Sequence, residues 1–278
     1  MTQGKKSIWT VFFTLCFVSL YSSSDPKTVV HFPNTDFELE VIRVNGKQPG
    51  PTLLIFGGIH GDEEGGFCSA ELLAQAKMKR GNLVIVPRVN FAGIMRYRRE
   101  IYGDMNRKFI DKEYPNDPDY KIVKLLKKLI SEADIFINQH DAHGFHRKKY
   151  ISKDYNPFRY GQSLIVDTGK IESVKLGKTV DIDKIGHQIV DNTNREIKNP
   201  KHHFCYWNQN SIDPDTKFKD MQKSATYYAV TRYKIPAFGL ETSKNLPNSE
   251  LKIKYQLLMI CKIMDAFEMS YEFTEERY

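Results

Sequence analysis

The sequence predicts an α/β domain with a mixed, largely parallel central sheet and helices on both of its faces. Short, continuous apolar runs such as residues 52–56 are typical of strands that are covered on both sides. Between these runs lie segments with the apolar spacing of amphipathic helices, of which residues 120–132 are the clearest. Buried strands that alternate with helices favour this fold class, in which ligands bind beyond the carboxyl ends of the strands.

The individual elements follow from local patterns. Residues 28–32 and 37–44 flank the turn sequence PNTD and predict an opening antiparallel hairpin. The apolar runs predict core strands at residues 52–56, 82–87, 133–138, 163–166 and 236–241. The 3.6-residue spacing predicts helices at residues 66–79, 120–132, 181–198, 220–232 and 248–269, the second of them capped by the aspartates of NDPD.

The first 24 of the 278 residues read as an export signal. Lys5 and Lys6 precede an apolar run over residues 8–21, and serines follow it. This run is short for a permanent membrane span, although an uncleaved N-terminal anchor is the alternative. The rest shows no internal repeat and no Pro/Gly/Ser-rich linker, so we expect residues 1–24 to be a signal peptide and residues 25–278 to be one domain.

Charge and cysteine content exclude several classes of function. The formal net charge is +7, and removal of Lys5 and Lys6 leaves +5, which suits an anionic substrate. Basic residues do not alternate with stacking aromatics, so we expect no nucleic acid partner. Cys68, Cys205 and Cys261 are widely spaced, which argues against a disulfide framework and a thiolate metal site and indicates small buried residues.

The turn GGIHGDEEGGF follows the first predicted core strand and carries His60 and Glu63. Residues three apart on one turn can direct both side chains at one point. An imidazole nitrogen and a carboxylate oxygen suit zinc, and the glycines allow a tight turn. The pair alone is a common chance pattern, so it is a metal site only if further ligands join it.

A third ligand is expected from the segment INQHDAHGFHRKKY, which follows another buried strand. It offers His140, His143 and His146. Chemistry alone does not choose among them, but His140 lies nearest the strand end, where the chain has least freedom. Asp141 could orient an imidazole or cap a turn. The alternative for His143 and His146 is that they are loop or pocket-rim residues.

Two further groups of residues could take part in substrate binding or catalysis. The loop MRYRREIYGDMNRKF holds clustered arginines and the pair Asn106–Arg107, which could bind a carboxylate, although clustered arginines are usually surface charge. Glu241 ends the last predicted core strand, where it either caps the next turn or acts as a general base in the cleft.

Together these groups resemble the zinc metallocarboxypeptidases of the carboxypeptidase A type. The order is the same: HxxE, an arginine, an Asn–Arg pair, a histidine after a strand and a late glutamate. Five segments are similar in sequence to the branch of peptidoglycan D,L-carboxypeptidases that determine cell shape in helical and curved bacteria. They are GGIHGDEEGGF, YGDMNRKF, HDAHGFHRKKY, MQKSATYYAV and AFGLETSKNLP. The resemblance covers residues 52–258.

The resemblance implies a zinc ion held by His60, Glu63 and His140. It also implies that Asn106 and Arg107 bind the C-terminal carboxylate of the substrate. In that branch the substrate is the tripeptide stem of peptidoglycan, a muropeptide from which terminal meso-diaminopimelate is released to leave a dipeptide. Export to the periplasm fits such a substrate.

The same resemblance assigns the proton transfer and the oxyanion. Arg99 would polarise the scissile carbonyl, and Glu241 would take a proton from the attacking water and pass it to the leaving amine. Larger members of the branch carry further domains, and the short interval between Glu63 and His140 separates this chain from digestive carboxypeptidases.

Two other functions are compatible with the sequence. Zinc amidohydrolases of the succinylglutamate desuccinylase and aspartoacylase kind share the HxxE turn and an Asn–Arg pair, but they act on cytosolic acyl-amino acids. The other alternative is a muropeptide-binding protein without catalysis, against which the complete set of ligands and Glu241 argue.

Overall fold

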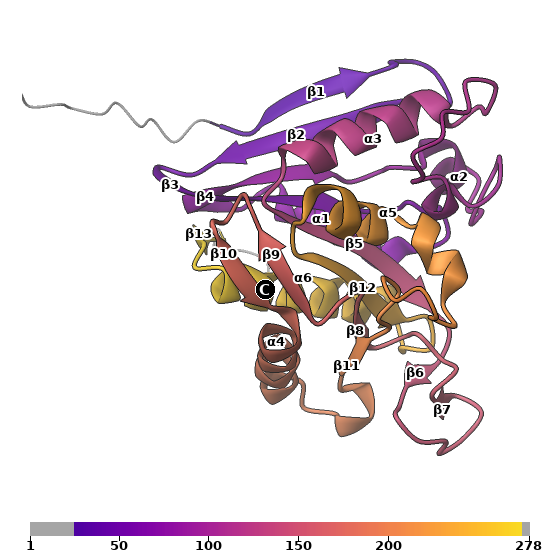
Figure 1. Cartoon of the computed structure of the whole chain (residues 1–278), viewed down its shortest axis with the longest axis vertical. Coiled ribbons are helices and arrows are strands. Elements are labelled where there is room, and N and C mark those ends of the chain that lie inside the picture. The colour runs from indigo at the N-terminus through magenta and orange to yellow at the C-terminus, as the bar shows by residue number, and fades with distance from the viewer. Residues whose placement is uncertain (1–24, 274–278) are drawn as a thin grey trace, which may run out of the picture.

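The computed structural model describes residues 25–273, so the predicted signal peptide at residues 1–24 lies outside it. Within the described residues, nine strands form a central sheet in the order β1-β2-β4-β3-β5-β12-β8-β11, and β13 pairs with β4 (Figure 1). These strands are β1 (Lys27–His31), β2 (Leu39–Asn45), β3 (Gln48–Phe56), β4 (Lys77–Val86), β5 (Ile135–Ala142), β8 (Ser163–Val166), β11 (Cys205–Asn208), β12 (Ala237–Ser243) and β13 (Ser270–Glu272).

The middle of the sheet is parallel. Strands β4, β3, β5 and β12 pair in parallel with their neighbours, while β1, β2 and β13 pair antiparallel at one end. Strand β8 runs antiparallel to β12, and β11 then runs parallel to β8. The predicted mixed, largely parallel sheet and its opening hairpin are confirmed.

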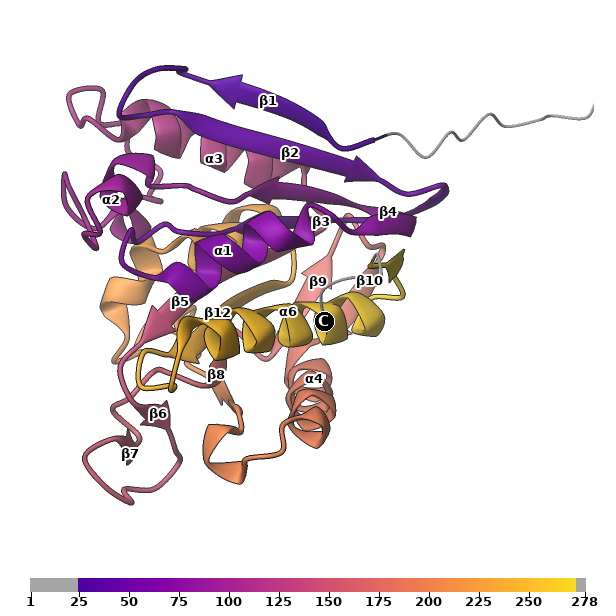
Figure 2. The same cartoon turned by 180° about the vertical axis from the view of Figure 1, so that it is seen from behind.

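Helices cover both faces of the sheet, as predicted. Helices α1 (Glu64–Leu73), α4 (Ile182–Glu196) and α6 (Ser249–Ala266) pack on one face, and α3 (Tyr120–Glu132) covers the other (Figures 1 and 2). Short elements complete the fold: α2 (Phe91–Met95), α5 (Ala225–Tyr228), the π-helix η4 (Ala229–Tyr233), the 3-10 turns η1 (Met105–Arg107), η2 (Pro200–His202) and η3 (Lys219–Lys223), and the strands β6 (Phe145–His146), β7 (Tyr155–Asn156), β9 (Lys170–Ser173) and β10 (Lys178–Asp181).

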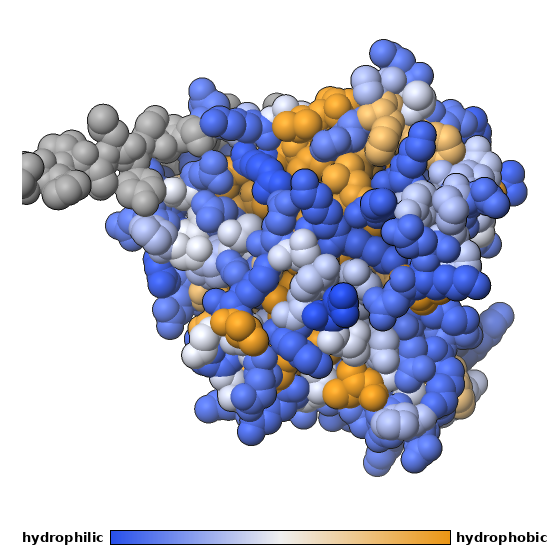
Figure 3. Space-filling view, turned by 45° about the horizontal axis from the view of Figure 1, so that its top comes forward, coloured by the Kyte–Doolittle hydropathy of each residue, from blue (hydrophilic) through white to orange (hydrophobic). Residues whose placement is uncertain are grey.

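The core lies between these layers. The run Leu53–Phe56 on β3 is fully buried, which is the property that its continuous apolar sequence predicts. The outer surface is largely hydrophilic in Figure 3, with apolar patches near the upper edge of that view. The three described cysteines are unpaired, and they are partly rather than fully buried. Among residues 25–273, no helix has the length and apolarity that crossing a membrane requires.

Two helix predictions and one capping prediction are wrong. The helix predicted at residues 66–79 ends at Leu73, because Lys77 to Lys79 alternate between exposed and buried side chains and begin β4. The helix predicted at residues 220–232 is broken at Ser224, whose hydroxyl accepts a hydrogen bond from the Tyr227 amide and starts α5. Asp119 precedes α3 but makes no capping bond, and its carboxylate accepts from Lys108 instead.

Candidate metal centre and cleft

The turn after β3 is fixed by close packing. Gly58 has a φ of +65°, a conformation that glycine adopts without strain. At Gly61 a Cβ atom would run into the backbone of Gly93, which follows from the tight contact between this turn and α2. The turn therefore holds His60 and Glu63 in place at the carboxyl end of a buried strand, and both side chains are almost fully buried.

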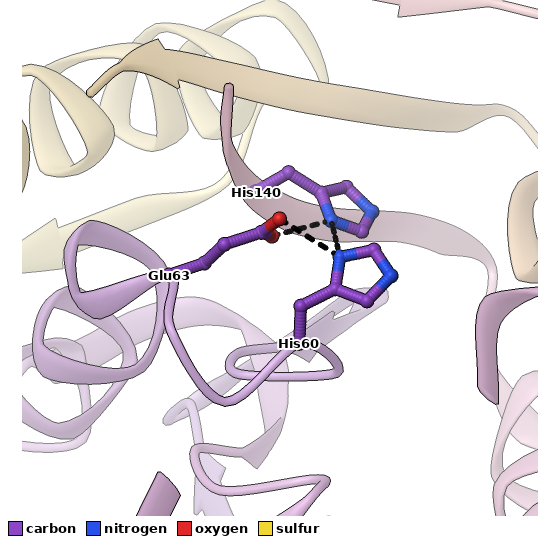
Figure 4. Close-up of side chains that lie close together, drawn as sticks. All are labelled: His60, Glu63 and His140. Atoms are coloured by element: carbon purple, nitrogen blue, oxygen red, sulfur yellow. Dashed lines mark hydrogen bonds and ion pairs between the residues drawn. The ribbon is translucent and has the colours of Figure 1, made fainter. Parts of the chain in front are cut away.

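His60, Glu63 and His140 converge on one point (Figure 4). Nδ1 of His60 lies 2.9 Å from Oε1 of Glu63, and Nδ1 of His140 lies 2.9 Å from Oε2 of the same carboxylate. The two Nδ1 atoms face each other at 3.2 Å. Two imidazole nitrogens directed at each other across a carboxylate form a donor set that fits a bound cation. The structure thus shows a buried group that could hold a metal.

The other two histidines of the segment have different surroundings. His143 lines the cleft without joining the group. Nδ1 of His146 lies 2.9 Å from the carbonyl oxygen of Arg159, and its ring stacks on Trp207 with a centroid distance of 4.2 Å. His146 therefore has a structural environment, and His143 lies at the rim.

Asp104 is a site residue that the sequence did not reveal. Its Oδ1 lies 3.0 Å from Nε2 of His60 and accepts a hydrogen bond from the backbone amide of Asn106 at 2.9 Å. Burial opposes a positive charge on His60, but the carboxylates of Glu63 and Asp104 raise its pKa to about 9. A carboxylate on the far nitrogen fixes the ring and makes it a stronger ligand. The signal available in the sequence is its place in GDMNRKF, after a glycine and before the predicted substrate pair.

The sequence leaves two roles open for Asp141, orienting an imidazole or capping a turn, and the structure shows that it caps a turn. Its carboxylate accepts from the backbone amide of Gly65 at 2.7 Å and from the hydroxyl of Thr242. Burial raises the pKa of Asp141 to about 6. The residue thereby joins the first turn of α1 to the strand β12 behind the metal ligands.

A glutamine on α6 forms hydrogen bonds to the strands β5 and β12 next to the metal group. Nε2 of Gln256 donates to the carbonyl oxygen of His140 at 2.8 Å and lies 3.2 Å from the hydroxyl of Thr242. Its Oε1 accepts from Nε2 of Gln139 at 3.1 Å. Gln256 is fully buried, so these bonds satisfy polar groups that water does not reach.

We expect Gln256→Leu to destabilise the fold. The change removes the bonds of Gln256 to the amide of Gln139 and to the carbonyl of His140, two buried groups that leucine cannot satisfy, which costs ~3 kcal/mol of unfolding free energy. Urea denaturation measures this loss. The exposed Gln75→Leu change is the control and should shift the unfolding free energy by less than ~0.5 kcal/mol. Equal stability of the two variants would contradict the role of Gln256.

The predicted substrate pair lies next to the metal group. Oδ1 of Asn106 accepts from the backbone amide of Ala225 at 3.0 Å, which orients the side chain toward Nε2 of His140 at 3.4 Å. Arg107 donates to the carbonyl oxygen of Asn106 at 3.1 Å, makes a weak contact of 3.7 Å with the sulfur of Met221, and its Nη1 lies 3.9 Å from a carboxylate oxygen of Asp104. Since the guanidinium is not paired bidentately, it has donors available for a ligand carboxylate.

Arg99 also lies beside the metal group. Its Nη1 donates to Oε1 of Glu63 at 2.6 Å, and its Nη2 lies 3.7 Å from Asp104. The side chain is about half exposed, so the positive charge is at the surface of the cleft beside the metal group.

Glu241 completes the cleft. Glu241 on β12 lies in register with His140 on β5, so its side chain is on the same face of the sheet as His140, next to the proposed metal ligands. Its Oε2 is buried and has no hydrogen-bond partner among residues 25–273. Burial and the nearby charge of Glu63 raise the pKa of Glu241 well above its usual value. A carboxyl group with a raised pKa is suited to holding a proton during a reaction.

These residues line one cleft of about 530 Å³. All seven residues that the sequence singled out belong to its walls: His60, Glu63, Arg99, Asn106, Arg107, His140 and Glu241.

Comparisons with known proteins give a matching family model and similar solved structures. A family model described as the catalytic part of a carboxypeptidase controlling helical cell shape matches residues 6–276. A search of curated proteins gave no match. Among solved structures, the apo form of the cell shape determinant protein Csd4 from Helicobacter pylori is 29% identical with a TM-score of 0.77, and the alignment covers 86% of this chain and 56% of that one.

Two further structures add detail. An mDAP-bound form of the same Helicobacter pylori protein, described as a D,L-carboxypeptidase, is 30% identical with a TM-score of 0.74, and the alignment covers 81% of this chain and 52% of that one. A succinylglutamate desuccinylase/aspartoacylase from Rhodobacter sphaeroides is 16% identical with a TM-score of 0.52 over 87% of this chain and 62% of that one, so it shares the fold. This chain spans a little over half the length of the Helicobacter pylori protein.

Proposed function

Since the chain belongs to the family of carboxypeptidases that control helical cell shape, we propose that it is a zinc-dependent D,L-carboxypeptidase. Its substrate would be the tripeptide stem of peptidoglycan, from which it releases meso-diaminopimelate and leaves a dipeptide. The solved relative has been described in tripeptide-bound and mDAP-bound forms, which supports this substrate class. The predicted export signal supports a periplasmic location and a domain that begins near residue 25.

One observation supports the proposal most strongly: a possible metal group and an Asn–Arg pair with the donors to bind a carboxylate share a single cleft. His60, Glu63 and His140 supply two nitrogens and a carboxylate, and Asn106 and Arg107 lie beside them. A carboxypeptidase must bind a free C-terminal carboxylate one residue away from the bond that it cleaves. Asn106 and Arg107 would bind that carboxylate, and the metal group beside them would act on the bond.

His60, Glu63 and His140 would hold the zinc ion, with Asp104 fixing the ring of His60. When bound there, zinc would supply a Lewis acid that lowers the pKa of water and polarises a carbonyl oxygen. The choice of two histidines and one carboxylate matches catalytic zinc sites, which keep a position open.

The other residues of the cleft would perform the proton transfer. Glu241 would take a proton from water as the water oxygen bonds to the carbonyl carbon, and its raised pKa would keep that proton on the carboxyl group. The same proton would then pass to the amide nitrogen as the carbon–nitrogen bond breaks, which releases the terminal residue as an amine. Arg99 would stabilise the negative charge that develops on the carbonyl oxygen, because its guanidinium lies in the cleft within hydrogen-bonding distance of Glu63.

A panel of substrates tests the proposal. Zinc-loaded protein is incubated with muropeptides bearing tripeptide, tetrapeptide and pentapeptide stems and with acyl-amino acids, and the products are identified by mass spectrometry. We expect turnover of the tripeptide stem, inhibited by a chelator. Turnover of acyl-amino acids alone would instead indicate an amidohydrolase, and binding of muropeptides without turnover would indicate a binding protein.

Arg107→Ala should weaken recognition of the terminal carboxylate. Loss of a charged hydrogen-bond pair costs ~3 kcal/mol, which corresponds to roughly a 100-fold fall in kcat/KM for the tripeptide stem. Steady-state kinetics measure the change. Arg107→Lys should restore only part of the loss, because an ammonium group cannot bind a carboxylate bidentately. The exposed Arg195→Ala variant is the control, and an Arg107→Ala enzyme with the kinetics of this control would contradict the assignment.

A further inference from the structure

The segment between β5 and β8 forms a loop that projects from the body of the fold. It carries the short strands β6 and β7 and lies at the edge of the molecule in both ribbon views (Figures 1 and 2). Two residues that flank it, His143 and Tyr160, line the cleft that contains the metal group. Residues 147–159, named the outer loop below, therefore lie next to this cleft.

The backbone of the outer loop is held by its own contacts. The amide of Ile151 donates to the carbonyl oxygen of Tyr155 at 2.9 Å, and the ring of Tyr155 stacks on Phe145 with a centroid distance of 4.5 Å. Nδ2 of the buried Asn156 donates to two carbonyl oxygens of the loop at 3.0 and 2.8 Å. The side chains that this loop exposes are thus presented from an ordered support.

Three large apolar side chains of the loop point away from the protein core. Tyr150 is 68% exposed, Ile151 is 67% exposed and Phe158 is 82% exposed. The backbone at Phe158 is fixed by a bond from its amide to Oδ1 of Asn156 at 2.9 Å. Several exposed apolar side chains on one ordered segment are typical of a surface that binds a partner or a membrane.

The free charged groups of the outer loop are mainly cationic. Lys148, Lys149 and Lys153 are exposed, and their ammonium groups have no hydrogen-bond or ion-pair partner among residues 25–273. Asp154 is the only acidic residue in the sequence of the loop. Apolar side chains beside free lysines complement the boundary between the acyl chains and the headgroups of an anionic membrane.

A saccharide is a poorer match for this loop. Recognition of a sugar requires hydrogen-bonding groups around an aromatic ring, and the only side-chain amide of the loop, that of Asn156, is buried and bonded to the loop's own carbonyl oxygens. Ile151 offers no aromatic face to a sugar ring. The combination of free groups therefore favours a lipid surface.

From these observations we propose that the outer loop binds an anionic lipid surface. Ile151 and Phe158 enter the boundary between headgroups and acyl chains, while Lys148 and Lys149 lie against the anionic headgroups. The predicted export signal would bring the chain to such a surface. The inference goes beyond the proposed function, because it concerns the place where the protein and its cleft are held.

A fluorescent reporter on the loop tests the proposal locally. The zinc-loaded full chain with Phe158→Trp is mixed with vesicles of equal parts phosphatidylglycerol and phosphatidylcholine, with or without bromine on the acyl chains. We expect the brominated chains to quench the fluorescence that this change adds. Val174→Trp is the control, since Val174 is 83% exposed in the turn between β9 and β10, which lies apart from the outer loop in Figures 1 and 2. Its added fluorescence should stay unchanged.

Cosedimentation with the same vesicles measures the contribution of each kind of side chain. Lys148→Gln combined with Lys149→Gln should weaken binding ~10-fold or more at low salt and by less at high salt, because salt screens the attraction of lysines to anionic lipids. Phe158→Ser should weaken binding ~10-fold or more at either salt concentration. Val174→Ser combined with Lys178→Gln makes the matching changes on the β9–β10 hairpin and should bind like the wild type. All variants share one N-terminus, so differences among them report the changed side chains.

Equal quenching of Phe158→Trp and Val174→Trp, or none in either, would overturn the inference. Because Phe158→Trp keeps a large aromatic side chain at an exposed position, loss of folding does not account for such a result. Cosedimentation with purified peptidoglycan sacculi but not with vesicles, lost in the loop variants, would also overturn it and would indicate the wall polymer as the partner. Cleavage of the tripeptide stem is measured separately, so failure of the proposed function leaves this test unaffected.

Discussion

Glu241→Gln should abolish turnover of the tripeptide stem while leaving the metal group complete. The amide has nearly the shape of the carboxylate but cannot take a proton from water, so kcat should fall ~1,000-fold or more. The structure gives the physical reason: Oε2 of Glu241 has no partner among the described residues, and burial and Glu63 raise the pKa of its carboxyl group. The Glu241 carboxylate is therefore able to accept the proton from the attacking water.

Single-turnover kinetics and zinc analysis on the same preparation measure this effect. Zinc content and tripeptide affinity should stay close to those of the wild type, because Glu241 is outside the predicted ligand set. The half-exposed Glu71→Gln change, whose carboxylate pairs with Arg88 away from the cleft, is the control and should keep full activity. A Glu241→Gln protein that retained even a tenth of the wild-type kcat would require another base.

His140→Ala should remove both the metal and the activity. The change deletes one of three converging donors and leaves His60 and Glu63 as a pair, which is too few for a stable zinc site. Asp104→Asn is a graded comparison: it keeps all three donors but weakens the bond to Nε2 of His60, so zinc affinity should fall only ~10–100-fold.

Zinc affinity in competition with a chromogenic chelator measures both variants. His146→Ala is the matched histidine control, since His146 bonds to Arg159 and stacks on Trp207 outside the metal group. We expect the affinities to fall in the order wild type, Asp104→Asn, His140→Ala, with His146→Ala near the wild type. Stoichiometric zinc in His140→Ala would contradict the proposed ligands.

The fold was predictable where a single local pattern determined the structure. Strand β3 and helix α3 follow from a continuous apolar run and a helical apolar spacing, and both were predicted correctly. The prediction was wrong where two patterns overlapped: Met78 fits a helical spacing with residues before it and a strand alternation with residues after it, and its pairing with Tyr271 of β13 decides in favour of β4. That pairing involves a segment more than 20 residues away, which local periodicity does not report.

The site was predictable to the extent that its residues stand in motifs. His60 and Glu63 follow β3, His140 lies near the carboxyl end of β5, and the structure brings their donor atoms within 4.8 Å of one another. Asp104 and Gln256 were not found, because their contacts with the site depend on partners distant in sequence. Gln256 contacts His140 across 116 positions, and nothing in its own helix marks it as polar support for a strand.

The most direct measurement of the central claim is diaminopimelate release as a function of zinc occupancy. Metal-free protein is titrated with zinc, and at each point the diaminopimelate released from the tripeptide stem is quantified by mass spectrometry. We expect no release without zinc and a rise that saturates at one zinc per chain. Full release by the metal-free protein, or an intact tripeptide stem at one zinc per chain, would contradict the proposed function.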